Sequence, residues 1–382
     1  MISGIEFAGV ASGIKAAGLD LGLVFFKEDM HVLSLYTKNK VKAAHILYDR
    51  RIDNNPVRAL LVNSGCANAC TGKEGVADLH AIGQELSSML GIEKEKVLFA
   101  STGVIGKRLP VDTIIGALPT LLKNLKTKHL QSFAQSIMTT DTFPKVVHET
   151  FQGNQEYNIA GVAKGAGMIN PLFATMLSFV FTDYPISPGS IKRVFSNAGK
   201  ETFERVTVDG ECSTNDTVML FTKSGNEDLS GLPAFKEKLL SVMRNLSLMI
   251  VKDGEGATRV VHVTVTGARK KEYAEKIARR IAISPLTKTA FFGCDPNWGR
   301  VIAAAGNADV PIQPSKVEII LQGEVLVKEG VEVPFDEQEM KKRMDKKEVE
   351  LIVDLHDGKA SYDIYTTDLT YDYIKINASY RS

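Results

Sequence analysis

Residues 161–177 read GVAKGAGMINPLFATML and nearly bisect the chain of 382 residues. The three glycines can adopt backbone conformations that other residues avoid, and Pro171 stiffens the approach to Thr175. Beyond Thr175, apolar side chains alternate along 177–181 in a way that predicts a buried strand. The stretch is therefore either an ordinary loop that enters a strand, or a strained segment that presents Thr175 at the tip of that strand.

The chemical interpretation is that the chain cleaves itself between Ala174 and Thr175. The Thr175 hydroxyl would attack the carbonyl of Ala174, whose small side chain leaves it accessible, and water would open the resulting ester. The new α-amine, with a pKa of about 7.7 to 8.0, could then act as the base for the hydroxyl beside it. Threonine before a strand is common, so this stretch alone leaves the structural interpretation open.

The composition favours small molecules as partners. The 46 basic and 45 acidic side chains leave a net charge of +1, which provides no field to attract nucleic acid or an anionic membrane. No secretion signal is recognisable, and no apolar run is long enough to span a bilayer. Four cysteines in so long a chain are typical of a reducing compartment, so we expect a cytoplasmic protein.

Hydrophobic periodicity indicates a mixed α/β protein, and the length suggests two lobes or one large layered unit. Helical spacing recurs over several segments, which are 74–90, 110–125, 187–205, 233–251 and 270–282. Strand-like runs lie between them, at 97–100, 176–183, 259–267, 316–323 and 349–355. The pattern alone supports an α/β class and nothing finer.

Common cofactor and metal motifs are missing from the sequence. GVIGK at 103–107 is too short for a phosphate-binding loop, and Arg108 stands where Ser or Thr would bind magnesium. GAGMIN at 165–170 lacks the last glycine of a dinucleotide fingerprint. The cysteines and histidines do not have zinc-site spacing, and no GxSxG elbow occurs. We expect neither a nucleotide cofactor nor a metal.

Eight unusual segments, in this order, closely resemble the ornithine acetyltransferase family of arginine biosynthesis, also called the bifunctional glutamate N-acetyltransferases. The similarity extends from GVASGIK at 9–15 to the last residues. The segments are NSGCANACTG (63–72), ASTGVIG (100–106), MTTDTFPK (138–145), GVAKGAGMINPLFATML (161–177), VDGECSTNDT (208–217), KDGEGATR (252–259), GCDPNWGR (293–300) and INASYRS (376–382).

The resemblance implies a precursor that is cleaved between Ala174 and Thr175. Its products would be an α fragment of 1–174 and a β fragment of 175–382, which stay together as an α2β2 heterotetramer. It also implies acetyl transfer by a ping-pong mechanism, in which Thr175 takes acetyl from N2-acetylornithine and passes it to glutamate. Bifunctional members use acetyl-CoA as a donor as well, and no bound cofactor is implied. The fold implied has sheets layered between helices, similar in plan to N-terminal-nucleophile hydrolases.

Several residues match positions that supply the family's oxyanion hole and bind its substrate. Thr102 and Gly103 would direct a hydroxyl and a backbone N–H at the developing negative charge. Lys164 would contact the acetylated amino acid, although a lysine is more often a solvated surface charge. Ordinary turn and surface roles are the structural alternatives for all three.

The remaining substrate contacts are implied further along the chain. Glu255, between two glycines in an expected loop, would place an anion beside the ammonium of ornithine. The substrate-contacting threonine of MTTDTFPK is assigned to Thr140, with Thr142 as the alternative. Asn377 and the terminal Ser382 would close over the substrate. The polar segment VDGECSTNDT suggests only a polar loop near the site.

Two other functions remain open at this stage. An N-terminal-threonine amidohydrolase or aminopeptidase would share the self-cleavage and the oxyanion hole but would release its acyl group to water. A non-enzymatic amino-acid-binding protein would stay one intact chain. Transfer of labelled acetyl to glutamate distinguishes an acetyltransferase from the amidohydrolase or aminopeptidase. The masses of the fragments distinguish it from the non-enzymatic binding protein.

Overall fold

The computed structural model describes residues 2–52, 56–170 and 176–379. These divide into two compact units, of which the first contains residues 2–204 and 211–250 and the second contains 205–210 and 251–379. The first unit combines sequence from both sides of the expected cleavage point, so the compact units differ from the expected α and β fragments. The division into those fragments stays a prediction.

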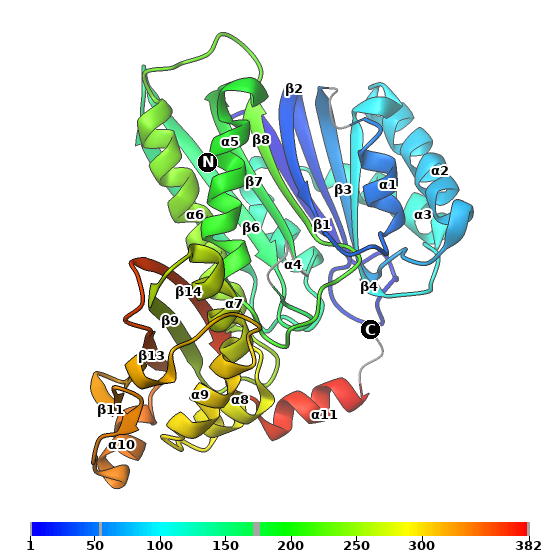
Figure 1. Cartoon of the computed structure of the whole chain (residues 1–382). Coiled ribbons are helices and arrows are strands. Elements are labelled where there is room, and N and C mark those ends of the chain that lie inside the picture. The colour runs from blue at the N-terminus through cyan, green and yellow to red at the C-terminus, as the bar shows by residue number, and fades with distance from the viewer. Residues whose placement is uncertain (1, 53–55, 171–175, 380–382) are drawn as a thin grey trace. The chain divides into compact units, whose positions relative to one another are not determined.

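The first unit is built on an eight-stranded sheet in the order β4-β3-β2-β8-β7-β6-β5, with β1 paired to β2 at the side (Figure 1). The pairs β3·β4 and β7·β8 are parallel, and the other pairs are antiparallel. The strands are β1 (Ile5–Val10), β2 (Leu21–Tyr36), β3 (Val57–Cys66), β4 (Val97–Val104), β5 (Lys145–Gln152), β6 (Glu156–Lys164), β7 (Leu177–Pro185) and β8 (Thr217–Lys223).

Strand β7 confirms the alternation expected after residue 176. Leu177, Phe179 and Phe181 belong to the apolar cluster on one face of the sheet. The other face is covered by helix α6, which can approach because Gly161 in β6 has no side chain. A Cβ there would lie 2.6 Å from Leu246 of α6. The strand is therefore buried on both faces from its first residue, Leu177.

The expected helices of the first unit are present. The helix expected over 187–205 ends earlier, at Glu201, and a separate 3-10 turn follows over Phe203–Arg205. The helix is therefore shorter than the periodicity predicts. The helices are α1 (Ala44–Asp49), α2 (Gly72–Leu90), α3 (Val111–Lys123), α4 (Leu130–Ser136), α5 (Pro188–Glu201) and α6 (Leu232–Lys252).

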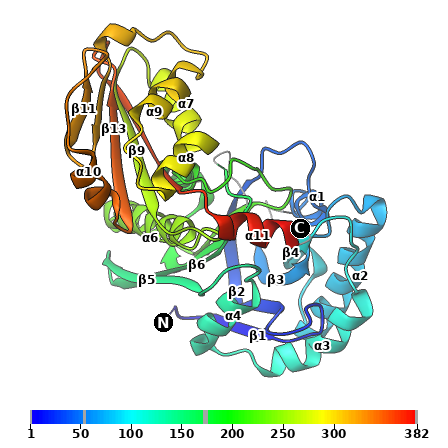
Figure 2. The same ribbon diagram turned by 90° about the horizontal axis from the view of Figure 1, so that it is seen from below.

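The second unit has a six-stranded sheet in the order β12-β11-β10-β13-β9-β14, in which only the pair β13·β9 is parallel within the described residues. Figure 2 shows helices α7, α8 and α9 against one face. The strands are β9 (Val260–Ala268), β10 (Glu318–Leu321), β11 (Glu324–Lys328), β12 (Val331–Glu332), β13 (Glu348–Asp354) and β14 (Ala360–Thr367). The helices are α7 (Lys271–Ala282), α8 (Pro285–Phe292), α9 (Trp298–Gly306), α10 (Glu337–Met344) and α11 (Tyr371–Ser379).

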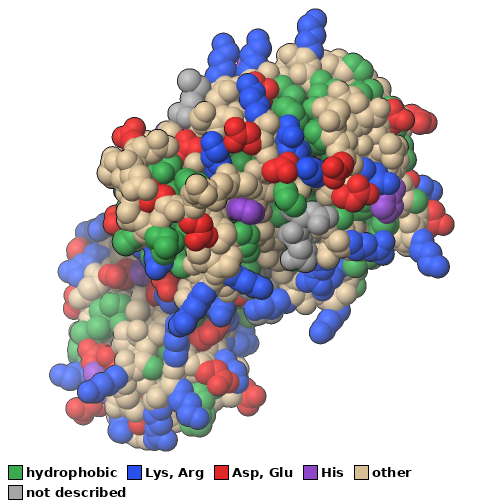
Figure 3. All heavy atoms as spheres, turned by 90° about the horizontal axis from the view of Figure 1, so that it is seen from above, with side chains coloured by type: hydrophobic (Ala, Val, Ile, Leu, Met, Phe, Trp, Pro, Cys, Tyr) green, Lys and Arg blue, Asp and Glu red, His purple; other side chains and the backbone are tan. Residues whose placement is uncertain are grey.

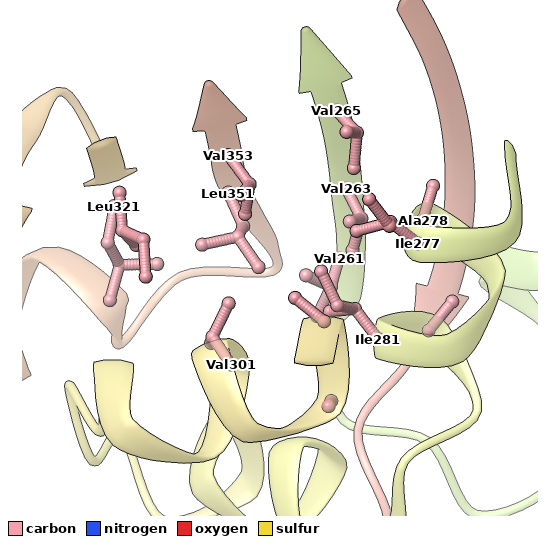
Figure 4. Close-up of a cluster of buried hydrophobic side chains, with 14 of the residues drawn as sticks. Val261, Val263, Val265, Ile277, Ala278, Ile281, Val301, Leu321, Leu351 and Val353 are labelled. Carbon is pink, nitrogen blue, oxygen red and sulfur yellow. The ribbon is translucent and has the colours of Figure 1, made fainter. Parts of the chain in front are cut away.

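The core of the second unit follows from the alternation along its two parallel strands. Val261, Val263 and Val265 of β9 point toward Ile277 and Ile281 of α7, as Figure 4 shows. All of these side chains are fully buried. A strand is predicted at 316–323, but the observed strand β10 is shorter because a 3-10 turn over Pro314–Lys316 precedes it.

The mixed α/β class is thus confirmed. Figure 3 shows basic and acidic side chains interspersed on the face it presents, which agrees with the balanced net charge. In the described part of the chain, every helix is too short or too polar to cross a membrane.

Candidate active site

The expected oxyanion residues lie where β4 ends beside β3 in the first unit. Thr102 is 9% exposed, and Gly103 pairs with Gly65 across the two parallel strands. Gly103 has a φ of 131°, in a region that favours glycine. A Cβ at this position would lie 2.3 Å from the carbonyl carbon of Gly65. Both the backbone conformation and the close strand contact therefore require glycine here.

We expect Gly103→Ala to lower self-cleavage and acetyl transfer by about 10²- to 10³-fold, the usual cost of losing one oxyanion donor. The added methyl must displace the turn and with it the Gly103 N–H. Gly116→Ala is the matched control, because nothing lies within 4 Å of its Cβ position and alanine favours the helix. Rates of cleavage and transfer measure the effect. Equal rates in the two variants would contradict the oxyanion assignment.

The alkyl chain of Lys15 packs beside this turn. Its Cγ lies 2.8 Å from the position that a Cβ on Gly65 would take, and its Nζ donates to the carbonyl of Met138 at 3.1 Å. Asp20 fixes the surrounding 12–15 turn by accepting backbone N–H groups from it. Burial lowers the pKa of Lys15, and the carboxylate of Asp20 opposes that shift. Lys15 therefore connects the oxyanion turn to the segment that holds Thr140.

Asp141 joins the two segments that are expected to bind substrate. One carboxylate oxygen accepts hydrogen bonds from the Nζ of Lys145 at 2.7 Å and from the N–H of Gly165 at 2.6 Å. The other accepts the N–H of Thr139 at 3.0 Å. The Asp141 and Lys145 side chains are 1% and 0% exposed, respectively. The ion pair with Lys145 keeps this buried carboxylate charged within the MTTDTFPK loop, and the hydrogen bond from Gly165 fixes the loop against the end of β6, where Lys164 lies.

Lys164 and the candidate threonines lie on these two segments. Lys164 is the last residue of β6 and is 5% exposed, so it is not the ordinary surface lysine that was its structural alternative. Its charge acts on the buried carboxylate of Asp141. Thr140 is half-buried, whereas Thr142 is exposed. The burial favours Thr140 over Thr142, and both assignments remain predictions.

Two of the expected substrate contacts meet within the second unit. Glu255 lies in a loop, as predicted, and its carboxylate accepts the Nδ2 of Asn377 at 2.9 Å. The approach depends on Gly256, where a Cβ would lie 2.3 Å from the backbone nitrogen of Tyr373 in α11. The same Asn377 amide donates to the carbonyl of Tyr373 at 3.0 Å. The glycine beside Glu255 thus lets α11 bring Asn377 to the carboxylate.

Glu255→Gln is expected to raise the KM for N2-acetylornithine by about 10- to 100-fold, because a hydrogen bond to a charged group contributes about 1.5 to 3 kcal/mol. Glutamine keeps the shape and can still accept from Asn377. The KM for glutamate should change far less, since glutamate carries no side-chain ammonium. Steady-state kinetics with both substrates, beside the exposed-site control Glu237→Gln, measure the difference. A similar rise for both substrates would contradict an ornithine-specific contact.

The cleavage residues Ala174 and Thr175 and the terminal Ser382 lie outside the described residues. Sequence reasoning did not single out Lys15 or Asp141, although both lie in quoted segments, GVASGIK and MTTDTFPK. The signal that could have identified them is a charged side chain placed among small or hydroxyl-bearing residues.

Comparison with known proteins decides the family. The model of the ArgJ family matches residues 6–382. The chain belongs to the ArgJ family. The resemblance carried by the eight segments is thereby confirmed over nearly the whole chain, and ArgJ family members include enzymes named for arginine biosynthesis.

ArgJ family relatives match this chain along its full length. The arginine biosynthesis bifunctional protein ArgJ of Geobacter sulfurreducens is 44% identical over 391 residues, with 100% of each chain covered. The glutamate N-acetyltransferase of Methanopyrus kandleri is 38% identical over 380 residues, with 97% of each chain covered. The crystal structure of the arginine biosynthesis bifunctional protein ArgJ from Bacillus halodurans matches at 36% identity with a TM-score of 0.50, covering 54% of this chain and 100% of that chain.

Proposed function

We propose that this ArgJ family protein transfers acetyl from N2-acetylornithine to glutamate through an acetyl ester on Thr175. The observation that carries the proposal is the full-length match to relatives named glutamate N-acetyltransferase and bifunctional ArgJ. The placement of the expected oxyanion turn, of the buried Lys164 and of the Glu255 pair with Asn377 supports it.

Self-cleavage creates the nucleophile. The Thr175 Oγ attacks the carbonyl carbon of Ala174, the C–N bond between the two residues breaks, and the Thr175 nitrogen leaves as a free amine. Water then hydrolyses the ester and releases the Ala174 carboxylate, which gives fragments 1–174 and 175–382. The solved ArgJ chain of Bacillus halodurans is covered completely by 54% of this chain, about the share that 175–382 represents. A solved family chain that spans about half of this one supports a division into two fragments.

Acetyl transfer uses the same hydroxyl in two steps. The Thr175 α-amine accepts the hydroxyl proton, Oγ attacks the acetyl carbonyl of N2-acetylornithine, and the C–N bond breaks with proton return to the ornithine amine. The α-amine of glutamate then attacks the acetyl ester, and Oγ leaves and regains its proton. Thr102 and Gly103 stabilise the oxyanion in both steps. Transfer between two similar amides is nearly balanced, so only the barriers need lowering.

Three finer features belong to the same proposal. The enzyme acts in the cytoplasm, its two fragments assemble as α2β2, and no bound cofactor takes part. Use of acetyl-CoA as a second acetyl donor is left open by the sequence, and the Geobacter sulfurreducens relative is named only as bifunctional. The shape of the outer pocket determines donor choice, which a few side chains can change.

Denaturing mass spectrometry tests the proposal. The purified protein should appear as two fragments divided at Ala174 and Thr175, and N2-acetylornithine should add about one acetyl mass to the 175–382 fragment. Added glutamate should remove the label and appear as N-acetylglutamate. An intact, unlabelled chain would overturn the mechanism. Release of acetate in place of N-acetylglutamate would identify a threonine amidohydrolase.

A further inference from the structure

The polar segment VDGECSTNDT contains two buried residues that hydrogen-bond to Met176, just after the proposed nucleophile, and to Ser101, just before the oxyanion pair. Asn215 is 5% exposed and Asp216 is 2% exposed. They precede β8, the strand that lies beside β7 in the first unit (Figure 1). Neither has a role in the reaction as proposed above.

Asp216 holds the residue that follows the nucleophile. Its carboxylate Oδ1 accepts the backbone N–H of Met176 at 3.0 Å in a buried setting. The carbonyl of Met176 in turn accepts the N–H of Thr217 at 3.0 Å. Both backbone polar groups of Met176 are therefore held by two consecutive residues, Asp216 just before β8 and Thr217 at its start. Met176 directly follows Thr175 in the sequence, so this pair of bonds holds the residue next to the proposed nucleophile.

Asn215 holds the residue that precedes the oxyanion pair. Its Nδ2 donates to the carbonyl of Ser101 at 2.7 Å and to that of Ala67 at 2.6 Å. The orientation of the amide is set by Thr214, whose hydroxyl donates to the Asn215 Oδ1 at 2.6 Å. Ser101 is followed directly by Thr102. The adjacent residues Asn215 and Asp216 thus hold two backbone positions, one just before Thr102 and one just after Thr175 in the sequence.

The segment itself is anchored along its length. The carbonyl of Asp216 accepts the N–H of Thr37 at 3.0 Å, and the carbonyl of Thr214 accepts the N–H of Ala43 at 2.9 Å. The Nδ2 of Asn39 donates to the carbonyl of Cys212 at 2.8 Å. A segment fixed at three points cannot move independently, so it is suited to keep a constant spacing.

We propose that Asn215 and Asp216 are positioning residues that set the spacing between Met176, which follows the proposed nucleophile in the sequence, and Ser101, which precedes the oxyanion pair Thr102 and Gly103. This inference rests on the proposed function, because it assumes that these groups carry the reaction. A displacement of about 1 Å between reacting groups can cost about 10²-fold in rate. Self-cleavage and acetyl transfer use the same nucleophile and the same oxyanion hole, so both depend on the spacing.

The test compares Asp216→Ala with Asp216→Asn. Alanine removes the acceptor for the Met176 N–H, whereas asparagine keeps an oxygen that can accept it. Asp216→Ala should slow self-cleavage by about 10²-fold, and Asp216→Asn should restore most of that rate. Self-cleavage is followed on denaturing gels after cell-free synthesis. In protein that has completed cleavage, kcat should fall by a similar factor while the KM for N2-acetylornithine stays within about twofold. Asn215→Ala should show the same division between kcat and KM.

Asp228→Ala is the matched control for a purely structural role. Asp228 is also buried, and it accepts backbone N–H groups from Asn154, Ser230 and Gly231. It lies beside the turn before β6, roughly 25 Å along the strand from Lys164, at about 3.3 Å per residue. The control should lower the melting temperature at least as much as Asp216→Ala, while its rates stay near those of the wild type.

Two results would overturn the inference. One is a loss of rate in Asp216→Ala no greater than in the Asp228 control of equal melting temperature. The other is an Asp216→Asn variant as slow as Asp216→Ala. Complete absence of cleavage in an Asp216→Ala protein that melts like the control would support it. Acetyl labelling of the wild type is measured first. Failure there would defeat the proposed function, whereas labelled wild type with an equally fast Asp216→Ala variant defeats only the positioning role.

Discussion

Thr175→Ala should leave the protein as one uncleaved chain of about 41.7 kDa with no acetyltransferase activity above background. The alanine side chain has no hydroxyl to attack Ala174, so neither the ester nor the new α-amine can form. The same change removes the group that would carry acetyl. Loss of a covalent nucleophile costs up to about 10⁶-fold in kcat, which makes this the largest expected effect on activity. Denaturing gels and the acetyl-labelling assay measure both consequences.

Thr175→Ser is the matched control, because serine keeps the hydroxyl and loses only a methyl group. It should cleave and transfer acetyl at measurable rates. The strand that begins at Leu177 is buried on both faces, so a similar melting temperature in both variants would show that the alanine variant is folded. Cleavage of the Thr175→Ala chain between 174 and 175 would return this position to the structural interpretation of a loop before a strand.

Asp141→Asn should lower the free energy of unfolding of the protein by about 3 to 5 kcal/mol, the typical cost of removing one partner of a buried ion pair. The Lys145 ammonium, fully buried and 2.7 Å from the carboxylate, would lose its counter-charge. Urea unfolding measures the change. The double variant Asp141→Asn/Lys145→Met should recover much of it, because the uncompensated charge is then absent. A single variant as stable as the wild type would contradict the ion-pair description.

The pH dependence of this effect has a defined sign. Burial alone would raise the pKa of Asp141, but the charges of Lys164 and Lys145 and the hydrogen bond from Gly165 hold it below its ordinary value. Since the folded pKa is the lower one, the carboxylate's contribution is complete above the unfolded pKa of about 3.9 and is lost only as the pH falls through the folded value. The stability difference between wild type and Asp141→Asn should therefore stay constant from pH 7 to about 4.5. A difference that already declines between pH 7 and 5 would assign it to another group.

The local pattern of the sequence predicted the longer helices and some of the strands. Helices α2, α3, α6 and α7 lie where the apolar spacing predicts them, because that spacing follows from the geometry of a single helix. The eight ordered segments likewise identified the family, which the match over residues 6–382 confirms. Strands with less regular patterns were not predicted, among them β2, whose pairing shifts register between Phe25 and Met30.

The contacts around the site could not be predicted in the same way. Asp216 is 40 residues from Met176, and Asn215 is 114 residues from Ser101, in the hydrogen bonds that join them. No periodicity or spacing relates residues so far apart, because their proximity depends on the order of strands in the sheet. The sequence by itself determined the longer helices, several strands and the family, and it led to the proposed role of Thr175. Only the tertiary structure decided which buried carboxylates and amides hold the segments around it, since those bonds form when separate strands meet.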